Sequence, residues 1–403
     1  MAGCGFHMIQ KPLDAVTKAD IDALIANKVC ECRTIEYKKE LPGDSDEDKR
    51  EFLADVSSFA NAAGGDILYG VTATEGIPVA ALGLSGNLDS AKLRMESIIR
   101  DGIEPRIQGI GLRIVEGFSG GCVLIVHMPK SWSAPHMVTF KRLSRFFSRT
   151  SAGKYQLDVT EIRSAFLMSE SLSEKIKHFR NDRLARIVAG ETPVPLRKGA
   201  RLILHILPVV SFASDFSLDI SIVAKHTINL KPMGDIGWNN RLNLDGVVTC
   251  SGGLSRADES LSYCQVFRSG QVESVYSGIV REDEGGRRFI ASVHYEENII
   301  MAVSKYLEVL KAIGVPCPLI IFISMVGVSG AFMWTSDTST PDAVAIDRDT
   351  IILSDIPIED YSLVGSEKDV AKTLRPNFDA VWNACGYERS MNFDTSGNWA
   401  PRK

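Results

Sequence analysis

The sequence lacks the short patterns that identify several large classes of protein. Its eight cysteines are scattered along the chain and never form a C-x-x-C pair, so we expect no structural zinc site. It contains no G-x-x-x-x-G-K phosphate-binding loop and no recognisable Ser/His/Asp signature. Internal repeats, heptad runs and low-complexity segments are also absent. The sequence therefore gives no support to a zinc finger, a P-loop ATPase or a repeat protein.

The sequence also has no apolar run long enough for a membrane helix. The longest run, LIIFISMVGVSGAFMW at residues 319–334, is shorter than the roughly 20 residues that such a helix needs. Because it contains Gly327, Gly330 and several β-branched residues, it predicts two buried strands joined by a tight glycine turn. No charged-then-apolar signal segment opens the chain. We therefore expect no membrane association and a cytoplasmic location.

Positive charge is not in excess. The net charge at pH 7 is −5, which argues against a protein that coats a polyanion along its whole surface. A local basic site remains compatible with this value, since recognition depends on where charge lies rather than on its sum. The length of 403 residues is sufficient for two domains, and the hydrophobic and charged contents of 45% and 24% are ordinary for a globular protein.

Helix and strand patterns alternate along the chain and predict an α/β fold. Two of them matter most: a helix from the acidic stretch 44–48 to Ala62, and a strand over 66–71 that follows Gly64-Gly65. Further helices are expected at 17–27, 89–101, from 158 to Met168, and at 170–189, 296–312 and 368–384. Further strands are expected at 34–38, 107–115, 122–128, 144–149, 202–209, 246–250, 262–267, 271–276 and 350–353.

The domain boundaries follow from these elements. We expect an N-terminal α+β domain at residues 1–168 and a helical connector at 169–199, in which the run E-T-P-V-P at 191–195 breaks the helical pattern. Residues 200–403 then form a mixed α/β domain without a motif of known chemistry. Sensing, homo-oligomerisation and substrate clamping are the roles we consider for it.

Two glutamates and a lysine form the first candidate site, in the stretch E-C-R-T-I-E-Y-K. Glu36 and Lys38 are two residues apart and share one face of a strand, whereas Glu31 joins them only if the chain bends. Carboxylates can hold Mg²⁺ or Mn²⁺ against a phosphodiester, and a lysine can stabilise the developing negative charge. The alternative interpretation is a surface strand with solvated charges.

The second candidate segment is K-R-L-S-R-F-F-S-R-T-S-A-G-K at residues 141–154, which contains no acid. Basic side chains can contact phosphates, and aromatic rings can stack on exposed bases. The alternative is a half-buried strand with phenylalanine inward and arginine outward. The candidate nucleic-acid contacts are Lys141, Arg142, Arg145, Phe147, Arg149, Lys154 and Tyr155.

Together, the pattern E-x-x-x-x-E-x-K at 31–38 and the run F-A-N-A-A-G-G-D-I-L-Y-G-V at 59–71 resemble the Schlafen-type AlbA-like domain. The similarity continues through V-H-M-P-K-S-W at 126–132 and R-F-F-S-R-T-S-A-G-K-Y at 145–155. The resemblance implies a nucleic-acid-binding module. In Schlafen nucleases two glutamates and a later aspartate cleave transfer and ribosomal RNA. The matching residues make Glu31, Glu36 and Lys38 the expected catalytic residues, with Mg²⁺ or Mn²⁺ as cofactor.

The aspartate of that family pattern is missing. An acid is expected directly after Gly70-Val71, where this chain has Thr72-Ala73. Glu75 is close enough in sequence to take its place, and Asp66 is a more distant alternative. The expected metal ligands are therefore Glu31, Glu36 and Glu75.

Two functions remain open from the sequence, besides an interaction scaffold whose C-terminal domain oligomerises. The first is a metal-dependent endoribonuclease acting on tRNA-like or rRNA-like substrates, with a role in bacterial defence. The second is a non-catalytic DNA- or RNA-binding regulator or sensor whose C-terminal domain forms homo-oligomers.

Overall fold

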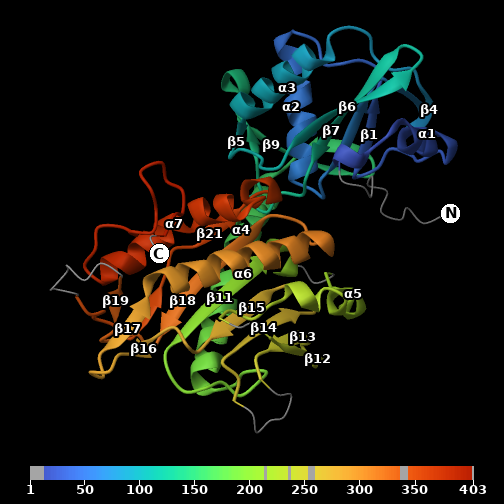
Figure 1. Ribbon diagram of the computed structural model, residues 1–403. Coiled ribbons are helices and arrows are strands. Elements are labelled where there is room, and N and C mark those ends of the chain that lie inside the picture. Colours follow the sequence, from blue (N-terminus) through green and yellow to red (C-terminus); the bar gives the residue numbers. More distant parts are fainter. Residues whose placement is uncertain (1–12, 213–215, 235–236, 253–258, 336–343, 402–403) are drawn as a thin grey trace. The chain divides into compact units, whose positions relative to one another are not determined.

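A computed structural model of the chain describes residues 13–212, 216–234, 237–252, 259–335 and 344–401. Helices and strands alternate along the chain, which confirms the predicted α/β class (Figure 1). The chain divides into two compact units, Met1–Leu172 and Ser173–Lys403. No described helix is both long enough and apolar enough to span a membrane.

The N-terminal unit is built on a four-stranded sheet with helices on both faces. The strand order is β1 (Ile35–Lys38), β2 (Gly65–Tyr69), β7 (Gly121–Met128) and β6 (Gly111–Phe118); β1 and β2 are parallel and the other pairs antiparallel. Helices α2 (Asp46–Ala60) and α3 (Leu88–Gly102) pack in the core on one face, and α1 (Lys18–Ala26) on the other. Alternation along β1 therefore decides which helix each side chain meets.

A second, smaller sheet covers α2 from another side. Its strand order is β10 (Gly153–Gln156), β9 (Arg145–Thr150), β8 (Met137–Val138) and β5 (Ile103–Glu104). Every residue of α2 from Phe52 to Ala60 is buried, and α2 contacts β8, β9 and β10 as well as α3 and β7. This full enclosure explains why the polar residues Asp55, Ser57 and Ser58 are also buried. A hairpin of β3 (Val71–Thr74) and β4 (Ile77–Ala81) completes the strands of this unit.

Helix α4 (Val159–Ala189) is continuous over 31 residues. The prediction of two separate helices, with a break near Ser169, was wrong. The sequence between Val159 and Ala189 contains no glycine or proline, so nothing in the backbone chemistry stops the helix there. The helix begins in the first compact unit and ends in the second.

The C-terminal unit contains one large antiparallel sheet. Its strand order is β12 (Asn239–Leu242), β13 (Gly246–Cys250), β14 (Ser262–Phe267), β15 (Val272–Tyr276), β11 (Arg201–Pro208), β18 (Leu319–Val326) and β20 (Thr350–Ile352), and β21 (Ile356–Ile358) also pairs with β18. Alternate residues of β11 face opposite sides. Leu202 and Leu204 join the core beneath α6 (Ser292–Ala312) and α7 (Glu367–Ala384), whereas Ile203 packs with Ile187 of α4 (Figure 1).

Short elements complete the unit: α5 (Ile220–Ala224) and a small sheet of β16 (Arg281–Glu282), β17 (Arg288–Ala291) and β19 (Phe332–Trp334). The apolar run 319–334 forms two strands, as predicted. They do not pair with each other, however, because β18 lies inside the large sheet and β19 pairs with β17. Pro376 lies inside α7.

Candidate nucleic-acid interface

Strand β1 and helix α2 bring two acids and a lysine together. Glu36 and Lys38 share the face of β1 that points toward α2, and Asp55 projects from the buried side of that helix. Lys38 Nζ lies 2.7 Å from Glu36 Oε1 and 3.4 Å from Asp55 Oδ2. Asp55 is only 3% exposed, so its charge depends on these neighbours rather than on water.

Two basic residues of the second sheet complete this group. Arg149 of β9 donates to Glu36 Oε2 at 2.9 Å, and its guanidinium stacks 3.5 Å from the centre of the Phe59 ring. Lys154 of β10 donates to Asp55 Oδ1 at 2.6 Å and also to Glu51. We call this group the ion-pair cluster; its members are Glu36, Lys38, Glu51, Asp55, Arg149 and Lys154.

The two most buried acids of the cluster respond differently to their surroundings. Burial raises the pKa of Glu36, but Lys38 and Arg149 outweigh it, so the pKa is lowered overall. The pKa of Asp55 is raised, first by deeper burial and then by the charge of Glu36, despite the two lysines. Burial would lower the pKa of Lys38, yet Asp55 and Glu36 raise it to about 12. Lys38 is therefore a permanent cation between two acids.

Glu31 lies outside the ion-pair cluster. Its Oε1 accepts a hydrogen bond from the backbone N–H of Tyr37 at 3.0 Å, and its own N–H donates to the Gly76 carbonyl at 2.7 Å. The chain does bend between Glu31 and Ile35, as the prediction required, but the carboxylate accepts from β1, and the backbone N–H of Glu31 holds this segment beside the β3–β4 turn. Glu31 thus has a local structural partner.

The alternative third acids do not complete a metal site. Glu75 is an exposed residue of the β3–β4 turn with a left-handed φ of 51°. Asp66 is buried on the other face of the sheet, where its Oδ1 lies 2.7 Å from His127 Nδ1. In the described ranges, no three His, Cys, Asp or Glu side chains are placed to hold a metal ion.

The chemistry of the carboxylate oxygens also argues against a metal site at these residues. Mg²⁺ and Mn²⁺ need carboxylate oxygens that are ionised and open to the ion. The oxygens of Glu36 and Asp55 instead accept hydrogen bonds from Arg149 and Lys154 and face Lys38. The expected set Glu31, Glu36 and Glu75 does not come together, and the residues present do not fit a divalent metal.

The candidate nucleic-acid contacts divide into an inner and an outer group. Phe147 packs against the core of the unit, and Arg149 and Lys154 point into the ion-pair cluster. The outer group is exposed or held by exposed partners: Lys141 pairs with Asp46 at 2.6 Å, Arg145 donates to Gln156, and the Tyr155 hydroxyl donates to Glu161 at 3.1 Å. Arg142 is exposed, and its side chain makes no ion pair with the residues described.

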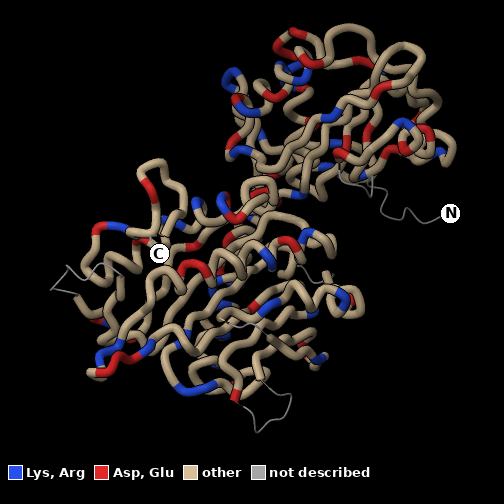
Figure 2. Tube along the Cα trace, viewed as in Figure 1, with Lys and Arg blue, Asp and Glu red and all other residues tan. Residues whose placement is uncertain are grey.

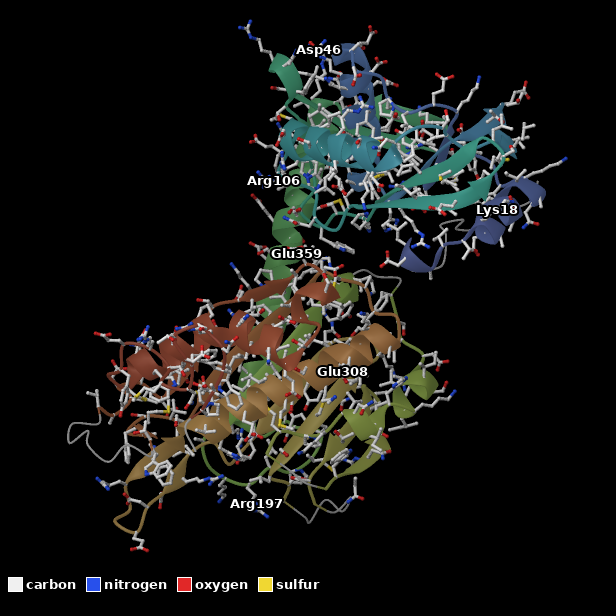
Figure 3. All side chains as sticks on the ribbon, turned by 45° about the horizontal axis from the view of Figure 1, so that its top comes forward. Lys18, Asp46, Arg106, Arg197, Glu308 and Glu359 are labelled. Atoms are coloured by element: carbon white, nitrogen blue, oxygen red, sulfur yellow. The ribbon has the colours of Figure 1, made fainter. Side chains whose placement is uncertain are left out.

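Two of the outer basic residues, Lys141 and Arg142, lie on one turn. The 3-10 turn η2 (Phe140–Arg142) places Lys141 and Arg142 in left-handed conformations, with φ of 44° and 67°. This turn leads into β9 at Arg145 and lies beside the beginning of α2, where Asp46 is located (Figure 3). In the view of Figure 2, acidic and basic positions are interspersed along the tube of this unit.

Asp55 and Glu51 were missed from the sequence. Asp55 lies three residues after Phe52 and four before Phe59, so it falls on the apolar face that these two phenylalanines mark on the helix. An acid on such a face is a signal of a buried ion pair. That signal was available, although the partner Lys154 is 99 residues away from Asp55 in sequence.

The class of the N-terminal unit is thus an α/β domain whose sheet edge carries a buried ion-pair cluster beside an exposed basic turn. Residues 31–158 match the family model described as Schlafen, AlbA_2, so this part of the chain is similar to that family. The C-terminal half matches no family model. No curated protein matches the chain.

Among solved structures, the chain is similar to the DIP2311 protein from Corynebacterium diphtheriae. The identity is 15%, and the match covers 35% of this chain and 26% of that one, with a TM-score of 0.24. The chain therefore spans about a quarter of the length of that protein. A similarity at this TM-score indicates neither a shared fold nor a shared function.

Proposed function

We propose that the N-terminal unit binds nucleic acid and that its contacts are centred on the turn before β9. The proposal is supported by the match of residues 31–158 to the Schlafen AlbA_2 family model. The contacting residues are the exposed cations of that turn, Lys141 and Arg142, together with Arg145 at the start of β9. Phosphate contacts of this kind position a protein on RNA or DNA without selecting a sequence.

The single observation that carries the proposal is the backbone of this turn. Left-handed φ values are uncommon for residues other than glycine, and each costs on the order of 1 kcal/mol or more. Here two such residues, Lys141 and Arg142, follow one another. Strained conformations of this kind cluster at functional sites, and this one presents two adjacent cations at the surface.

The ion-pair cluster sets a limit on the number of phosphate contacts. Arg149 and Lys154 already neutralise Glu36 and Asp55, so they are not free to neutralise phosphates. Only a few cations remain for the ligand, and the affinity should fall gently with salt, since the slope follows the number of phosphates neutralised. Because the carboxylates are occupied in the same way, the proposal stops at binding and does not include cleavage.

Fluorescence anisotropy with labelled single-stranded RNA, a transfer RNA and duplex DNA tests the proposal. We expect Arg142→Ala to weaken binding several-fold and to lower the salt slope by about one. Arg100→Ala is the matched control, because Arg100 is an exposed arginine of α3 that pairs with its neighbour Asp101. Equal affinity of wild type and Arg142→Ala for all three ligands would refute the assignment of this turn.

A further inference from the structure

A serine and a histidine of the N-terminal unit are joined by a hydrogen bond outside the ion-pair cluster. Both lie in the loop between β7 and β8, with Ser131 five residues before His136. Ser131 Oγ is 2.6 Å from His136 Nε2. Neither residue belongs to the nucleic-acid contacts proposed above, so that function leaves the pair without a role.

The second ring nitrogen decides which atom of this hydrogen bond is the donor. His136 Nδ1 lies 2.6 Å from the carbonyl oxygen of Pro105, which can only accept. Burial lowers the pKa of His136 and outweighs the hydrogen bond to Pro105, so the ring is neutral at pH 7. A neutral imidazole carries one proton, which Nδ1 needs for Pro105. Nε2 therefore keeps its lone pair and accepts from the Ser131 hydroxyl.

This order of groups is that of a serine nucleophile, a general base and a group that orients the base. The base must lie within hydrogen-bond reach of the nucleophile, at about 2.6–3.2 Å, and a third group must hold its ring. The carbonyl of Pro105 has the third role here, which an aspartate has in the Ser-His-Asp triad. The geometry thus meets both conditions without an acid.

The backbone on both sides of the pair is held in place. Asn61, which follows α2, accepts from the His136 N–H at 2.6 Å and donates to the His136 carbonyl at 2.9 Å. The Ser131 N–H donates to the Ala60 carbonyl at 3.2 Å. His136 is fully buried, whereas Ser131 is only half-buried. The serine is therefore the member of the pair that a molecule in solution can reach.

The same loop offers backbone donors to negative charge. The Ser133 N–H donates to Ser131 Oγ at 3.3 Å and stabilises the charge that develops there when the proton leaves. In α/β hydrolases, the N–H of the residue after the nucleophile stabilises the oxyanion of the substrate. That residue is Trp132 here, and its N–H donates to no residue that the structure describes.

We propose that Ser131 is the nucleophile of an esterase site for small carboxylic esters, with His136 as its general base. Nε2 takes the hydroxyl proton while Oγ bonds to the carbonyl carbon of the ester. The ester C–O bond then breaks, and the leaving alcohol takes the proton from Nε2. Water, deprotonated by the same nitrogen, next attacks the acyl-serine, releases the acid and restores the Ser131 hydroxyl. The proposal does not rest on nucleic-acid binding by this unit.

Labelling of the full chain with a fluorophosphonate, a reagent for activated serines, tests the nucleophile. Peptide mass spectrometry should locate the label on Ser131, and Ser131→Ala should lose both the label and the hydrolysis of p-nitrophenyl acetate. Ser119→Ala is the matched control, because Ser119 is an exposed serine of the β6–β7 turn, and it should react like wild type. Wild type that reacts no faster than Ser131→Ala would overturn the proposal, as would a label on Ser133.

The substitution His136→Gln tests the base. Glutamine can accept a hydrogen bond but cannot take up a proton at neutral pH, so labelling should slow by about a hundredfold or more. In wild type, the rate should be constant from pH 7 to pH 8 and fall as the pH drops below 6.5, because Nε2 must be unprotonated. If a melting curve shows that His136→Gln does not fold, the pH profile of wild type still decides. A rate that rises steadily up to pH 8 would overturn the proposal.

Discussion

Asp55 is the residue on which the charge balance of the N-terminal unit depends. It is buried between two sheets and faces Lys38 and Lys154, which come from different strands. Removing one member of a buried ion pair leaves the other charge without compensation and costs more than the pair contributes. The two lysines would then be drawn toward water or toward Glu36 and Glu51.

Asp55→Ala is therefore expected to lower the free energy of unfolding of the N-terminal unit by about 3 kcal/mol. Chemical denaturation followed by circular dichroism measures this change. Asp22→Ala removes an exposed acid that pairs with Lys18 on α1, and it should cost less than about 1 kcal/mol. Equal effects of the two substitutions would mean that the ion-pair cluster does not stabilise the fold.

Glu273 is the buried acid of the C-terminal unit that corresponds to Asp55 in the N-terminal unit. It is fully buried in the large sheet, where Arg183 of α4 donates to both of its oxygens at 2.7 and 2.8 Å. His205 Nε2 lies 2.9 Å from Oε2, and the Tyr263 hydroxyl donates to Oε1 at 2.7 Å. Burial raises the pKa of Glu273, but these partners outweigh it and lower the pKa to about 2.

This pKa predicts acid sensitivity. Because the folded value lies below the ordinary value of 4.5, the network stabilises the unit fully above pH 4.5 and loses this contribution as the pH falls toward 2. The loss is on the order of 3 kcal/mol. Denaturant unfolding at a series of pH values should show this loss in wild type but not in Glu273→Gln. Parallel pH profiles of the two proteins would contradict the assignment.

For individual residues, the sequence identified the residue types of the site better than it identified the side chains that each of them contacts. Glu36 and Lys38 were expected to share a face, and they do. Their neighbours Arg149 and Asp55 were not foreseen as partners, because spacing along the chain gives no information on contacts over 113 residues. The apolar face of α2 could have revealed Asp55, but not the lysine that it binds.

Among the elements, α4 shows how an apolar stripe positions a helix. The described residues that it buries are Ile176, Leu184 and Ile187, all in its second half. Leu184 and Ile187 pack with Ile203 of β11 in the core of the C-terminal unit. This half of the helix is therefore held by side-chain packing as well as by Arg183.

Ile187→Ala should destabilise the C-terminal unit by about 3 kcal/mol, since it leaves a cavity beneath the large sheet. Val188→Ala is the control at the next position, where the side chain is exposed. Hydrogen exchange read by mass spectrometry distinguishes the units. Faster exchange is expected in β11 and β13 of Ile187→Ala and not in the N-terminal sheet. Equal exchange in both variants would show that α4 is not docked through this residue.

Strands and helices were predictable where their pattern is local, and pairing was not. The apolar run at 319–334 was read correctly as two strands, yet β18 pairs with β11 and β19 with β17. Pairing depends on partners far along the chain, which a period of two residues does not specify. The helix stop near Ser169 was wrongly placed for a different, local reason: no residue there interrupts the backbone.

For the molecule as a whole, the sequence predicted the class of the chain better than its chemistry. The α/β class and the similarity to the Schlafen AlbA_2 family followed from the sequence, because both rest on long patterns. The pair of Ser131 and His136 did not follow, since the group that orients the histidine is the backbone carbonyl of Pro105. The metal site also failed to assemble, because the charges that it needs are paired internally.

Divalent metals should therefore leave the whole protein unchanged. Neither millimolar Mn²⁺ nor chelation with EDTA is expected to shift Tm, since a ligand that does not bind the folded state cannot stabilise it. Transfer RNA incubated with the protein and Mn²⁺ should remain intact on a denaturing gel. If the wild-type protein cleaves transfer RNA only with metal, and Glu36→Ala does not cleave it, then the carboxylates do form a metal site and this prediction is refuted.

The ion-pair cluster also has a consequence for synthesis of the chain. The acids of the ion-pair cluster are synthesised long before most of its cations, because Asp55 and Lys154 are 99 residues apart and Glu36 and Arg149 are 113 apart. At about 5–20 residues per second, this interval lasts roughly 5–20 s. A nascent chain that ends before Arg145 has Lys38 but neither Arg149 nor Lys154. Helix α2 can therefore be enclosed only when translation of the domain is nearly complete. A pause before that point exposes an acidic edge of the incomplete sheet to chaperones.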